Sequence, residues 1–383
     1  MCTDIPTTAR QLRSTLHASG ILEISLAQIP MSPLADEDVL VRIEAAPINP
    51  SDLNLLFESA DLDACVLTGT PSDPVLTARV PPHLLQFAAA RIGRACSVGN
   101  EGAGTVVRAG EARAARALLG KKVACFGGGM YADYRCVPVA QTLLLPDAAS
   151  VADGASSFVN PMTAQMMIHT MRTEGHRAIV HTAAASNLGR MLNRLCISDN
   201  VPLINVVRKE DQVLALQAAG AQIVFNASRT NFRDELVEAL IQTKATVAFD
   251  AIGGGETVDC LLNAMETAAS RGQPDFSAYG SAYGSFVHKQ VYIYGGLDSS
   301  PTILRRTYGM SWGICAFLLP AVMMKAGFEV IEAMRQRIAA ELTTTFATHY
   351  GAEISLTDML HPEAAHAYSR IATGRKYLVR PHG

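Results

Sequence analysis

Residues 177–209 constrain the fold of this chain most, because they combine two apolar runs with a tight turn and a helix-compatible segment. The first apolar run, 178–181, ends in a block of small residues, and the second run covers 201–207. The order strand, turn, helix, strand is the first unit of a dinucleotide-binding parallel sheet. We therefore expect a nucleotide site at this turn.

The turn itself departs from the usual pattern of three glycines. Ala184 and Ser186 occupy the first two key positions, and only Gly189 keeps the third, which permits close packing of the helix. No side chain larger than threonine occurs in 182–186, so the helix N-terminus can still donate amides to a phosphate. The alternative is a packing unit of the same shape that binds no ligand.

A pair of cations, Arg208 and Lys209, follows the second strand. An acid that binds a ribose hydroxyl is usual at this position, whereas positively charged side chains suit a 2′-phosphate. The sequence therefore favours NADPH over NADH as the cofactor. The alternative is that both residues are ordinary solvated charges at the end of a strand.

Strands and helices alternate from about residue 161 onward, which predicts a doubly wound parallel sheet. Ligands of such sheets bind at the carboxyl ends of the strands. Two glycine-containing segments follow later strands at this edge, 250–255 and 294–297. Glycine permits a ligand to approach the backbone closely, and plain turn chemistry is the alternative.

The first third of the chain is β-rich. Because prolines occur at positions 71, 74, 81 and 82, we expect 58–96 to be a long loop with one helix at 82–92. Near the other end, one continuous helix is expected at 321–342. The clearest predicted strands alternate or run apolar between turn residues, at 21–29, 38–46, 103–108 and 122–126.

The predicted fold class is therefore α/β, with two domains. A β-rich domain is expected to comprise 1–160 with 343–383, because the final stretch returns to it. A Rossmann domain with a doubly wound parallel sheet is expected to comprise 161–342. A chain of 383 residues is long enough for two domains of ordinary size.

Composition excludes several classes of protein. The formal net charge of -3 and the absence of a basic stripe argue against a nucleic-acid partner. The longest apolar stretch, 312–324, is interrupted by Pro320 and is too short to span a membrane. No secretory signal is visible at the start, and the eight cysteines are scattered, so we expect reduced thiols and a cytoplasmic protein without a membrane partner.

Five segments in chain order resemble those of the medium-chain dehydrogenase/reductase superfamily, most closely its zinc-independent quinone oxidoreductase and enoyl reductase branch. The resemblance implies a GroES-like catalytic domain for the β-rich part. It also implies hydride transfer from NADPH to a small electron acceptor, and a homodimer formed near residues 302–318. The matching segments are 46–53 with Asn-Pro-Ser-Asp, 99–107 with Gly-Asn-Glu-Gly-Ala-Gly, 159–164 with Val-Asn-Pro-Met-Thr-Ala, 204–208, and 373–378 with Thr-Gly-Arg-Lys.

The residues at the metal positions of zinc-dependent relatives differ in this chain. Those relatives carry a cysteine before the Thr/Ser-Asp pair and a histidine in Gly-His-Glu. Here Asn49 and Pro50 precede Ser51-Asp52, and Asn100 replaces the histidine. A catalytic zinc needs three Cys, His or acidic ligands, and a structural zinc needs four closely spaced ligands. We therefore predict no metal.

The resemblance also assigns roles to single residues. Asn49 is expected near the nicotinamide carboxamide or the substrate, and Tyr131 is the nearest replacement for a tyrosine that relatives carry after Asn-Pro-x-Asp. Phe57 stands in that region here, and Tyr131 has a buried strand tyrosine as its alternative reading. The expected cofactor-binding residues are Asn160 and Thr163 near the nicotinamide, Ala185, Ser186 and Asn187 at the pyrophosphate, Arg208 and Lys209 at the 2′-phosphate, Ile252, Gly253, Gly295 and Gly296 along the nicotinamide ribose, and Lys376 from the returning segment.

Together these features predict NADPH-dependent reduction of a quinone or an α,β-unsaturated carbonyl compound, with an enoyl thioester as the alternative acceptor. The missing tyrosine slightly favours a quinone, because a quinone's oxyanion product takes a proton from solvent. The insertions at 58–97 and 271–285 are expected to shape the substrate site.

Two other classes of protein remain as alternatives. The sequence Gly309-Met-Ser-Trp-Gly313 matches the Gly-x-Ser-x-Gly pattern of hydrolases. A hydrolase elbow requires a strand, a strained turn and then a helix, whereas Ser311 lies in a stretch that is predicted to continue as a strand. The chain could also bind NADPH without turnover, as a structural or sensing protein.

Overall fold

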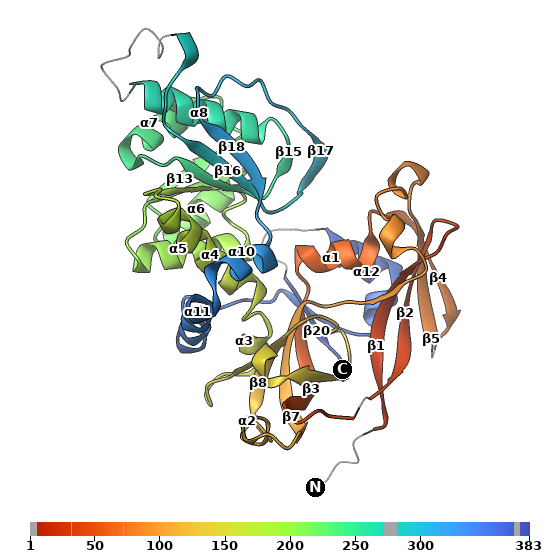
Figure 1. The fold of residues 1–383 in the computed structure, drawn as a ribbon. Helices are drawn as coiled ribbons and strands as arrows, with labels where there is room; N and C mark the ends of the chain where they lie inside the picture. Colours follow the sequence, from red (N-terminus) through yellow and green to blue (C-terminus); the bar gives the residue numbers. More distant parts are fainter. Residues whose placement is uncertain (1–5, 32, 72, 272–281, 371–375) are drawn as a thin grey trace. The chain divides into compact units, whose positions relative to one another are not determined.

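The computed structural model describes residues 6–31, 33–71, 73–271, 282–370 and 376–383. The chain forms two compact units, of which the first comprises Met1–Val159 with Arg335–Gly383 and the second Asn160–Met334 (Figure 1). The second boundary lies at Arg335 rather than at residue 343. The sequence placed it after the last helix of the parallel-sheet domain, whereas the division falls within that helix.

Two sheets form the first unit, and all of their strand pairs are antiparallel except β19–β20. The smaller sheet has the strand order β4-β5-β2-β1-β6. The larger has the order β10-β8-β7-β3-β20-β19, with β9 also paired to β3. The strands are β1 Thr8–Leu16, β2 Ile21–Pro30, β3 Asp38–Pro47, β4 Asp61–Thr70, β5 Asp73–Arg79, β6 Ala95–Ser97, β7 Glu101–Ala109, β8 Lys122–Phe126, β9 Tyr134–Pro138, β10 Thr142–Leu144, β19 Ala352–Ser355 and β20 Tyr377–Arg380.

Helices of the first unit are short and cover the sheets. Alternate residues of β3, such as Val39, Val41 and Ile43, are fully buried, as expected for strands with one face in a core. The α-helices are α1 Pro50–Phe57, α2 Arg113–Arg116, α3 Val151–Ala155 and α12 Pro362–Ser369, together with the carboxyl-terminal part of α11 Phe328–Ala340.

The predicted long loop at 58–96 is wrong, because most of it is folded. Strands β4 and β5 form a hairpin at the edge of the smaller sheet, and two 3₁₀ turns, Pro82–Leu84 and Ala89–Arg91, replace the predicted helix. An edge hairpin was hard to recognise, because β4 is almost entirely exposed and so lacks an apolar alternation. Pro71 lies in the connecting turn, where a proline does not interrupt the hydrogen bonds between strands.

The second unit contains a six-stranded, fully parallel sheet in the order β13-β12-β11-β14-β16-β18, and a short parallel pair of strands, β15–β17. Helices α7 and α8 lie on one side of the sheet and α4, α5 and α6 on the other (Figure 1). This confirms the predicted α/β class. The strands are β11 Ile179–His181, β12 Leu203–Val207, β13 Ile223–Asn226, β14 Val247–Asp250, β15 Gly253–Gly255, β16 Lys289–Ile293, β17 Asp298–Thr302 and β18 Trp312–Ala316.

The helices of this unit follow the predicted alternation, with one difference. Gly327 has a φ of +84° and divides the expected helix 321–342 into α10 and α11, because few residues other than glycine adopt that backbone conformation. The helices are α4 Val159–Thr173, α5 Asn187–Ser198, α6 Glu210–Ala218, α7 Phe232–Thr243, α8 Thr257–Arg271, α10 Leu319–Ala326 and the start of α11.

Two smaller expectations concern cysteines and membrane spans. The seven cysteines in the described ranges all carry free thiols. Across those same ranges, no helix is both long and apolar enough to cross a membrane. The predicted insertion at 271–285 lies mostly outside the described residues.

A buried ion pair holds β16 to α8 in the second unit. Lys289 is fully buried, and its Nζ donates to Glu266 Oε2 at 2.6 Å and to Ser285 Oγ at 2.9 Å. Glu266 also accepts from the backbone amide of Ser285 at 2.7 Å. A buried pair of this kind is stable only while both partners are present.

We predict that Lys289→Met lowers the free energy of unfolding by about 3–5 kcal/mol, because it leaves the Glu266 carboxylate buried without its cation. Urea denaturation followed by circular dichroism would measure this loss. Lys121→Met, at an exposed position, is the control and should change stability by less than about 0.5 kcal/mol. Equal stability of both variants would contradict the prediction.

Candidate functional site

Four neighbouring strands of the parallel sheet end at the same edge, and most of the predicted cofactor residues follow those ends. The strands β12, β11, β14 and β16 are adjacent in the sheet and point the same way. The order of strands reverses at β11, and ligands of open α/β sheets bind at such a point. The structure thus brings together Ala185, Ser186, Asn187, Arg208, Lys209, Ile252, Gly253, Gly295 and Gly296.

The turn after β11 is tight and leads directly into α5. Ser186 is the N-cap residue of α5, and its Oγ accepts the backbone amide of Gly189 at 3.1 Å. A Cβ atom at Gly189 would lie 2.2 Å from the carbonyl oxygen of Ala184, so only glycine fits. Ala185 is buried, whereas Ser186 and Asn187 are half-buried. The altered glycine pattern therefore still produces a turn whose helix N-terminus points to the strand-end edge.

A buried carboxylate ties the ends of β11 and β14 together. Asp250 is fully buried; its Oδ1 accepts the hydroxyl of Thr182 at 2.6 Å, and its Oδ2 accepts the amide of Gly253 at 2.8 Å. The Thr182 hydroxyl in turn accepts the amide of Ala251 at 2.8 Å. These bonds fix the loop that carries Ile252 and Gly253. The sequence placed Asp250 in a candidate motif but gave no signal for its contact with Thr182.

Glycines let the loop after β16 approach the loop after β14. A Cβ atom at Gly295 would lie 2.7 Å from the carbonyl oxygen of Ala251, and one at Gly253 would lie 3.0 Å from that of Gly295. Gly253 also has a φ of +81°. A Cβ atom at Gly296, by contrast, would meet nothing within 4 Å. Because Gly253 and Gly295 have no side chains, the two loops can come into close contact. Gly296 adjoins open space beside that contact.

Arg208 and Lys209 are both exposed directly beyond β12. The loop after β13 lies against them, because Ser228 Oγ donates to the carbonyl oxygen of Arg208 at 3.0 Å. Arg229 forms an ion pair with Glu210 at 2.5 Å. A serine hydroxyl and a third cation thus adjoin the predicted 2′-phosphate position. Sequence reasoning missed both because they follow a different strand.

Several acids stand near this basic pair: Glu210 and Asp211 follow it directly in the chain, and Asp298 approaches it from β17. The exposed carboxylate of Asp298 accepts the backbone amide of Ser300 at 2.8 Å. Hydrogen bonds from Ser300 and, to a smaller extent, the positive charge of Arg208 lower the pKa of Asp298. Asp298 therefore remains ionised and lies within electrostatic reach of Arg208.

Asn160 and Thr163 lie near the start of α4 and are both largely buried, with about 7% of each residue exposed. Their side chains therefore belong mainly to the packing around that helix. Their predicted contact with the nicotinamide stays a prediction.

A histidine and a tyrosine that the sequence did not single out pair at the same strand ends. His181 Nε2 lies 2.8 Å from the hydroxyl of Tyr294, and the two rings are stacked with centroids 5.7 Å apart. Burial lowers the pKa of His181 to about 3, so the imidazole is neutral. The pair joins β11 to the end of β16 as an uncharged contact.

In the first unit, Asn49 is fixed by three hydrogen bonds. Its Nδ2 donates to Glu101 Oε1 at 2.9 Å, its Oδ1 accepts from Lys376 Nζ at 2.8 Å, and its backbone amide donates to Asp52 Oδ2 at 2.8 Å. Only 1% of Asn49 is exposed. The structure thus brings together Asn49 and Lys376, which are 327 residues apart in the chain.

Two buried acids flank this asparagine. Glu101 Oε2 accepts the backbone amides of Phe158 and Val159 at 2.8 and 2.9 Å. Asp52 Oδ1 accepts the amide of Asn100 at 2.8 Å. Burial raises the pKa of Glu101, and it raises the pKa of Asp52 to about 7 in spite of the amides that Asp52 accepts. We refer to Asn49, Asp52, Glu101 and Lys376 as the asparagine cluster.

Tyr131 is fully buried, and its hydroxyl donates to the carbonyl oxygen of Pro47 at 3.0 Å. Burial, with the negative charge of Asp52 adding to it, raises the pKa of Tyr131 well above its usual value. This placement favours the interpretation of Tyr131 as a core residue over its interpretation as a proton donor. Its hydroxyl already donates a hydrogen bond and is not exposed to solvent.

The residues at the positions that hold zinc in metal-dependent relatives, Asn49 and Asn100, form hydrogen bonds with neighbouring side chains here. Asn100 Nδ2 donates to Ser51 Oγ at 3.0 Å, and Asn49 has the three contacts described above. Within the described ranges, no group of three or more His, Cys, Asp or Glu side chains is arranged to hold a metal ion.

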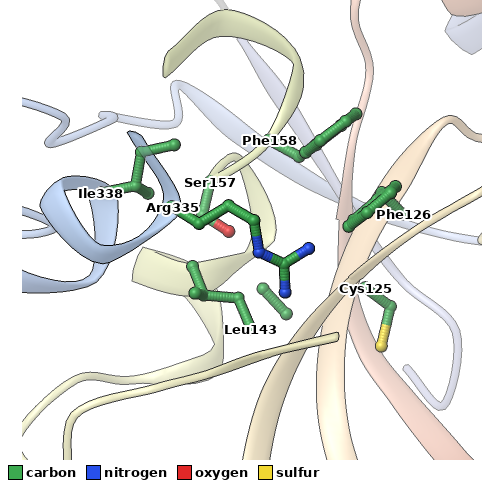
Figure 2. Close-up of a pocket in the computed structure, with 8 residues that line it drawn as sticks. Cys125, Phe126, Leu143, Ser157, Phe158, Arg335 and Ile338 are labelled. Carbon is green, nitrogen blue, oxygen red and sulfur yellow. The ribbon is translucent and has the colours of Figure 1, made fainter. Parts of the chain in front are cut away.

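A small pocket in the first unit lies between α11 and the larger sheet (Figure 2). The rings of Phe126 and Phe158 stack in it with centroids 3.9 Å apart, and the Arg335 guanidinium lies 5.5 Å from the Phe126 centroid. Arg335 also donates to the carbonyl oxygen of Ala140 at 2.9 Å. The pocket has a volume of about 10 Å³ and holds one water molecule at most. It therefore serves packing rather than substrate binding.

The hydrolase pattern at Gly309–Gly313 does not form a nucleophile elbow. Ser311 comes immediately before β18, so the required order of strand, turn and helix is absent. The Oγ of Ser311 lies 2.8 Å from Nδ1 of His288. This site therefore lacks the geometry of a hydrolase.

Comparison with known proteins agrees with this fold. Residues 35–147 match the alcohol dehydrogenase GroES-like domain. A candidate NADPH:quinone reductase from Mesorhizobium loti superposes with a TM-score of 0.72 at 22% identity, covering 99% of this chain and 100% of the other. The chain thus contains a GroES-like domain and shares the two-domain fold of that structure, as expected.

Two curated relatives match in sequence. Synaptic vesicle membrane protein VAT-1 homolog of Rattus norvegicus is 28% identical over 162 residues, which are 42% of this chain and 39% of that protein. Prostaglandin reductase-3 of Mus musculus is 25% identical over 271 residues, which are 69% of this chain and 62% of that protein. The match to the first relative thus spans about two-fifths of its length.

We predict that Gly189→Ala lowers the free energy of unfolding by about 1–3 kcal/mol, because the added Cβ collides with the Ala184 carbonyl and forces the backbone to shift. Gly296→Ala is the matched control, since its Cβ would meet open space. Chemical denaturation of both variants would measure the difference. An unchanged midpoint for Gly189→Ala would show that the turn can relax.

The raised pKa of Asp52 predicts a pH dependence of stability. The native state keeps the Asp52 proton up to a pH of about 7, whereas the unfolded state loses it near pH 4, so stability is greatest below pH 4 and falls as the pH rises to 7. The fall due to Asp52 is about 4 kcal/mol. Asp52→Asn should remove this part of the slope in urea denaturation, and exposed Asp73→Asn should not. Parallel slopes for wild type and Asp52→Asn would contradict the prediction.

Proposed function

We propose that this protein is an NADPH-dependent reductase that transfers a hydride to a quinone or an α,β-unsaturated carbonyl compound without using a metal. The observation that carries this proposal is the exposed pair Arg208–Lys209 directly beyond β12, next to the turn of small residues that begins α5. Two cations at that position favour a 2′-phosphate over a free ribose hydroxyl.

The strand-end edge fits a dinucleotide in other respects. The N-terminus of α5 offers amides to a pyrophosphate, and Ser228 and Arg229 add a hydroxyl and a cation beside the 2′-phosphate position. Gly296, beside the contact between the two loops, adjoins open space, because a Cβ atom there would meet nothing within 4 Å. These residues would hold NADPH, and the bound nicotinamide would supply the hydride.

The known proteins support a reductase rather than another activity on the same fold. The Mesorhizobium loti structure carries the name of an NADPH:quinone reductase, and the mouse relative that of a prostaglandin reductase. A frog relative, 25% identical over 261 residues, is a mitochondrial enoyl-[acyl-carrier-protein] reductase. A fold can host many activities, so we place weight on these names only together with the basic pair and the turn.

The acceptor we favour is a quinone or an enone, with an enoyl thioester as the second candidate. Relatives often carry a tyrosine after Asn-Pro-x-Asp, and this chain has Phe57 in that region, about 5% exposed. The buried Tyr131 does not replace it as a donor. A quinone needs no such donor, because its oxyanion product takes a proton from solvent.

Two further expectations from the resemblance stay predictions. A second copy of the chain is proposed to bind at the edge of the parallel sheet, where β18 exposes Cys315 and Ala316. A cytoplasmic location is expected from the reduced thiols.

We predict that Arg208→Ser combined with Lys209→Ser raises the KM for NADPH about 10- to 100-fold and leaves that for NADH within about twofold, because only the 2′-phosphate loses its charge-assisted hydrogen bonds. Oxidation of both cofactors at 340 nm with 1,4-benzoquinone, 9,10-phenanthrenequinone, a simple enone and a crotonyl thioester would measure this.

Arg113→Ser, at an exposed position of the first unit, is the matched control and should leave both KM values unchanged. If wild type oxidises NADPH and NADH equally well, the cofactor assignment is wrong. If wild type binds NADPH but oxidises it with none of the acceptors, the protein is a non-catalytic NADPH-binding protein.

A further inference from the structure

A second cavity in the first unit lies where β1, β2 and β9 meet. Its volume is about 110 Å³, far larger than that of the pocket beside Phe126, so it has room for several water molecules or a small ligand. All of its lining residues belong to the first unit. Its shape therefore does not depend on where the second unit lies.

One wall of this cavity carries a cation that lacks a counter-ion. The half-buried Arg135 lines the cavity, and its Nη2 donates to the carbonyl oxygen of Gly128 at 3.0 Å. Its Nε is buried and has no hydrogen-bond partner in the described part of the chain, where no carboxylate forms an ion pair with the guanidinium either. A cation withdrawn from water without an acid beside it costs free energy, which a bound anion would offset.

A second guanidinium group adds to the positive charge. Arg13 lies on the same face of β1 as Gln11, which also lines the cavity, because alternate residues of a strand share a face. The Nε of Arg13 is likewise buried without a partner among the described residues. Burial lowers the pKa of Arg135, and the positive charge of Arg13 lowers it further. An anion beside Arg135 would therefore attract both cations.

The acids on the neighbouring strands do not neutralise this wall. Asp133 is paired with Arg10 at 2.9 Å, and Asp38 accepts from Sγ of Cys136 at 3.5 Å. Burial, with the charge of Asp38 adding to it, raises the pKa of Cys136 to about 11, so the thiol is neutral. Among the described residues that line the cavity, Arg135 is thus the only charged one.

The other walls of the cavity are largely apolar. Ala9 and Ile29 are paired in the register of β1 and β2 and so lie on one face of the sheet, and Pro30 and Met31 continue the apolar surface. Ile29 and Met31 are half-buried. A hydrocarbon group gains from contact with such a surface, whereas inorganic phosphate would leave it wet. The cavity therefore suits an organic anion with a short apolar part.

We propose that this cavity binds a small monocarboxylate, with its carboxylate on Arg135 and its hydrocarbon part against Ala9, Ile29 and Met31. A guanidinium group matches a carboxylate through two parallel hydrogen bonds. This site is separate from the proposed cofactor site, because every residue that lines it belongs to the first unit.

The glycine loop beside the cavity holds Arg135 in place. Gly128 accepts from the guanidinium, and Gly129 accepts from Nε2 of Gln11 at 3.1 Å. A Cβ atom at Gly129 would lie 3.2 Å from Cζ of Arg135 and 2.9 Å from Nε2 of Gln11. The absence of a side chain at Gly129 therefore lets both polar side chains pack against the loop.

The experiment is a saturation-transfer NMR titration of the full chain with butyrate. Butan-1-ol is the uncharged counterpart of butyrate, and inorganic phosphate is added as a competitor. The variants are Arg135→Met, Arg135→Lys and Met31→Ala, with Arg113→Met at an exposed position as the matched control. Thermal denaturation would verify that each variant is folded.

We expect wild type to bind butyrate saturably with a Kd of about 1 mM, and butan-1-ol about tenfold more weakly or worse. Arg135→Met should weaken butyrate binding about tenfold or more, and Arg135→Lys by a smaller factor, because lysine keeps the charge and loses the paired hydrogen bonds. Met31→Ala should weaken it about two- to fivefold through lost apolar contact. Arg113→Met should leave the Kd within about twofold.

A further control separates this cavity from the strand-end edge. Arg208→Ser combined with Lys209→Ser removes the exposed cations beyond β12 and should leave the Kd for butyrate unchanged. If that double variant loses butyrate binding, the anion binds at the strand-end edge and the inference is wrong.

Three other results would overturn the inference. If Arg135→Met binds butyrate as well as wild type does, Arg135 does not hold the carboxylate; if that variant does not fold, an unchanged Kd in both Arg135→Lys and Met31→Ala has the same meaning. If phosphate binds more tightly than butyrate, the cavity takes an inorganic anion. If wild type binds no butyrate, the cavity holds water alone. None of these results bears on the proposed function, because no measurement involves NADPH.

Discussion

The burial of one carboxylate, that of Glu101, decides the arrangement around the asparagine cluster. A buried carboxylate that lacks partners costs several kcal/mol, so the folded chain must supply donors to it. It does so with the backbone amides of Phe158 and Val159 and with the side chain of Asn49. These hydrogen bonds connect β7 to the start of α1 and to the start of α4. Asn49 in turn accepts a hydrogen bond from Lys376, so the position of Lys376 also depends on Glu101.

The second unit also has a buried, hydrogen-bonded carboxylate, which lies at its strand ends. Asp250 is fully buried and takes its donors from the Thr182 hydroxyl and from the loop that follows β14. Among the residues that the structure describes, neither carboxylate has a charged side chain as its hydrogen-bond partner. Backbone amides and neutral side chains satisfy both, which fixes loop geometry without the long, flexible side chains of an ion pair. These hydrogen bonds hold the loop that carries Ile252 and Gly253 to the end of β11.

The sequence was most informative where a periodic pattern coincided with a local rule. Strand β8 begins and ends where it was predicted, and the turn between β11 and α5 forms despite Ala184 and Ser186, because small residues preserve its geometry. The sequence failed at the β4–β5 hairpin, where most side chains are exposed and no apolar alternation exists. It also failed at α10 and α11, because the pattern of apolar residues continues through the break at Gly327.

The sequence by itself determined the fold class, the alternation of strands and helices from β11 to α8 and the basic pair after β12, because each depends on residues that are close together in the chain. Only the tertiary structure decided which distant residues meet. It joined Asn49 to Lys376, brought Ser228 against Arg208, and buried Tyr131 with its hydroxyl on a carbonyl oxygen. Such contacts depend on how strands from separate parts of the chain pair in a sheet, and local patterns carry no information about that pairing.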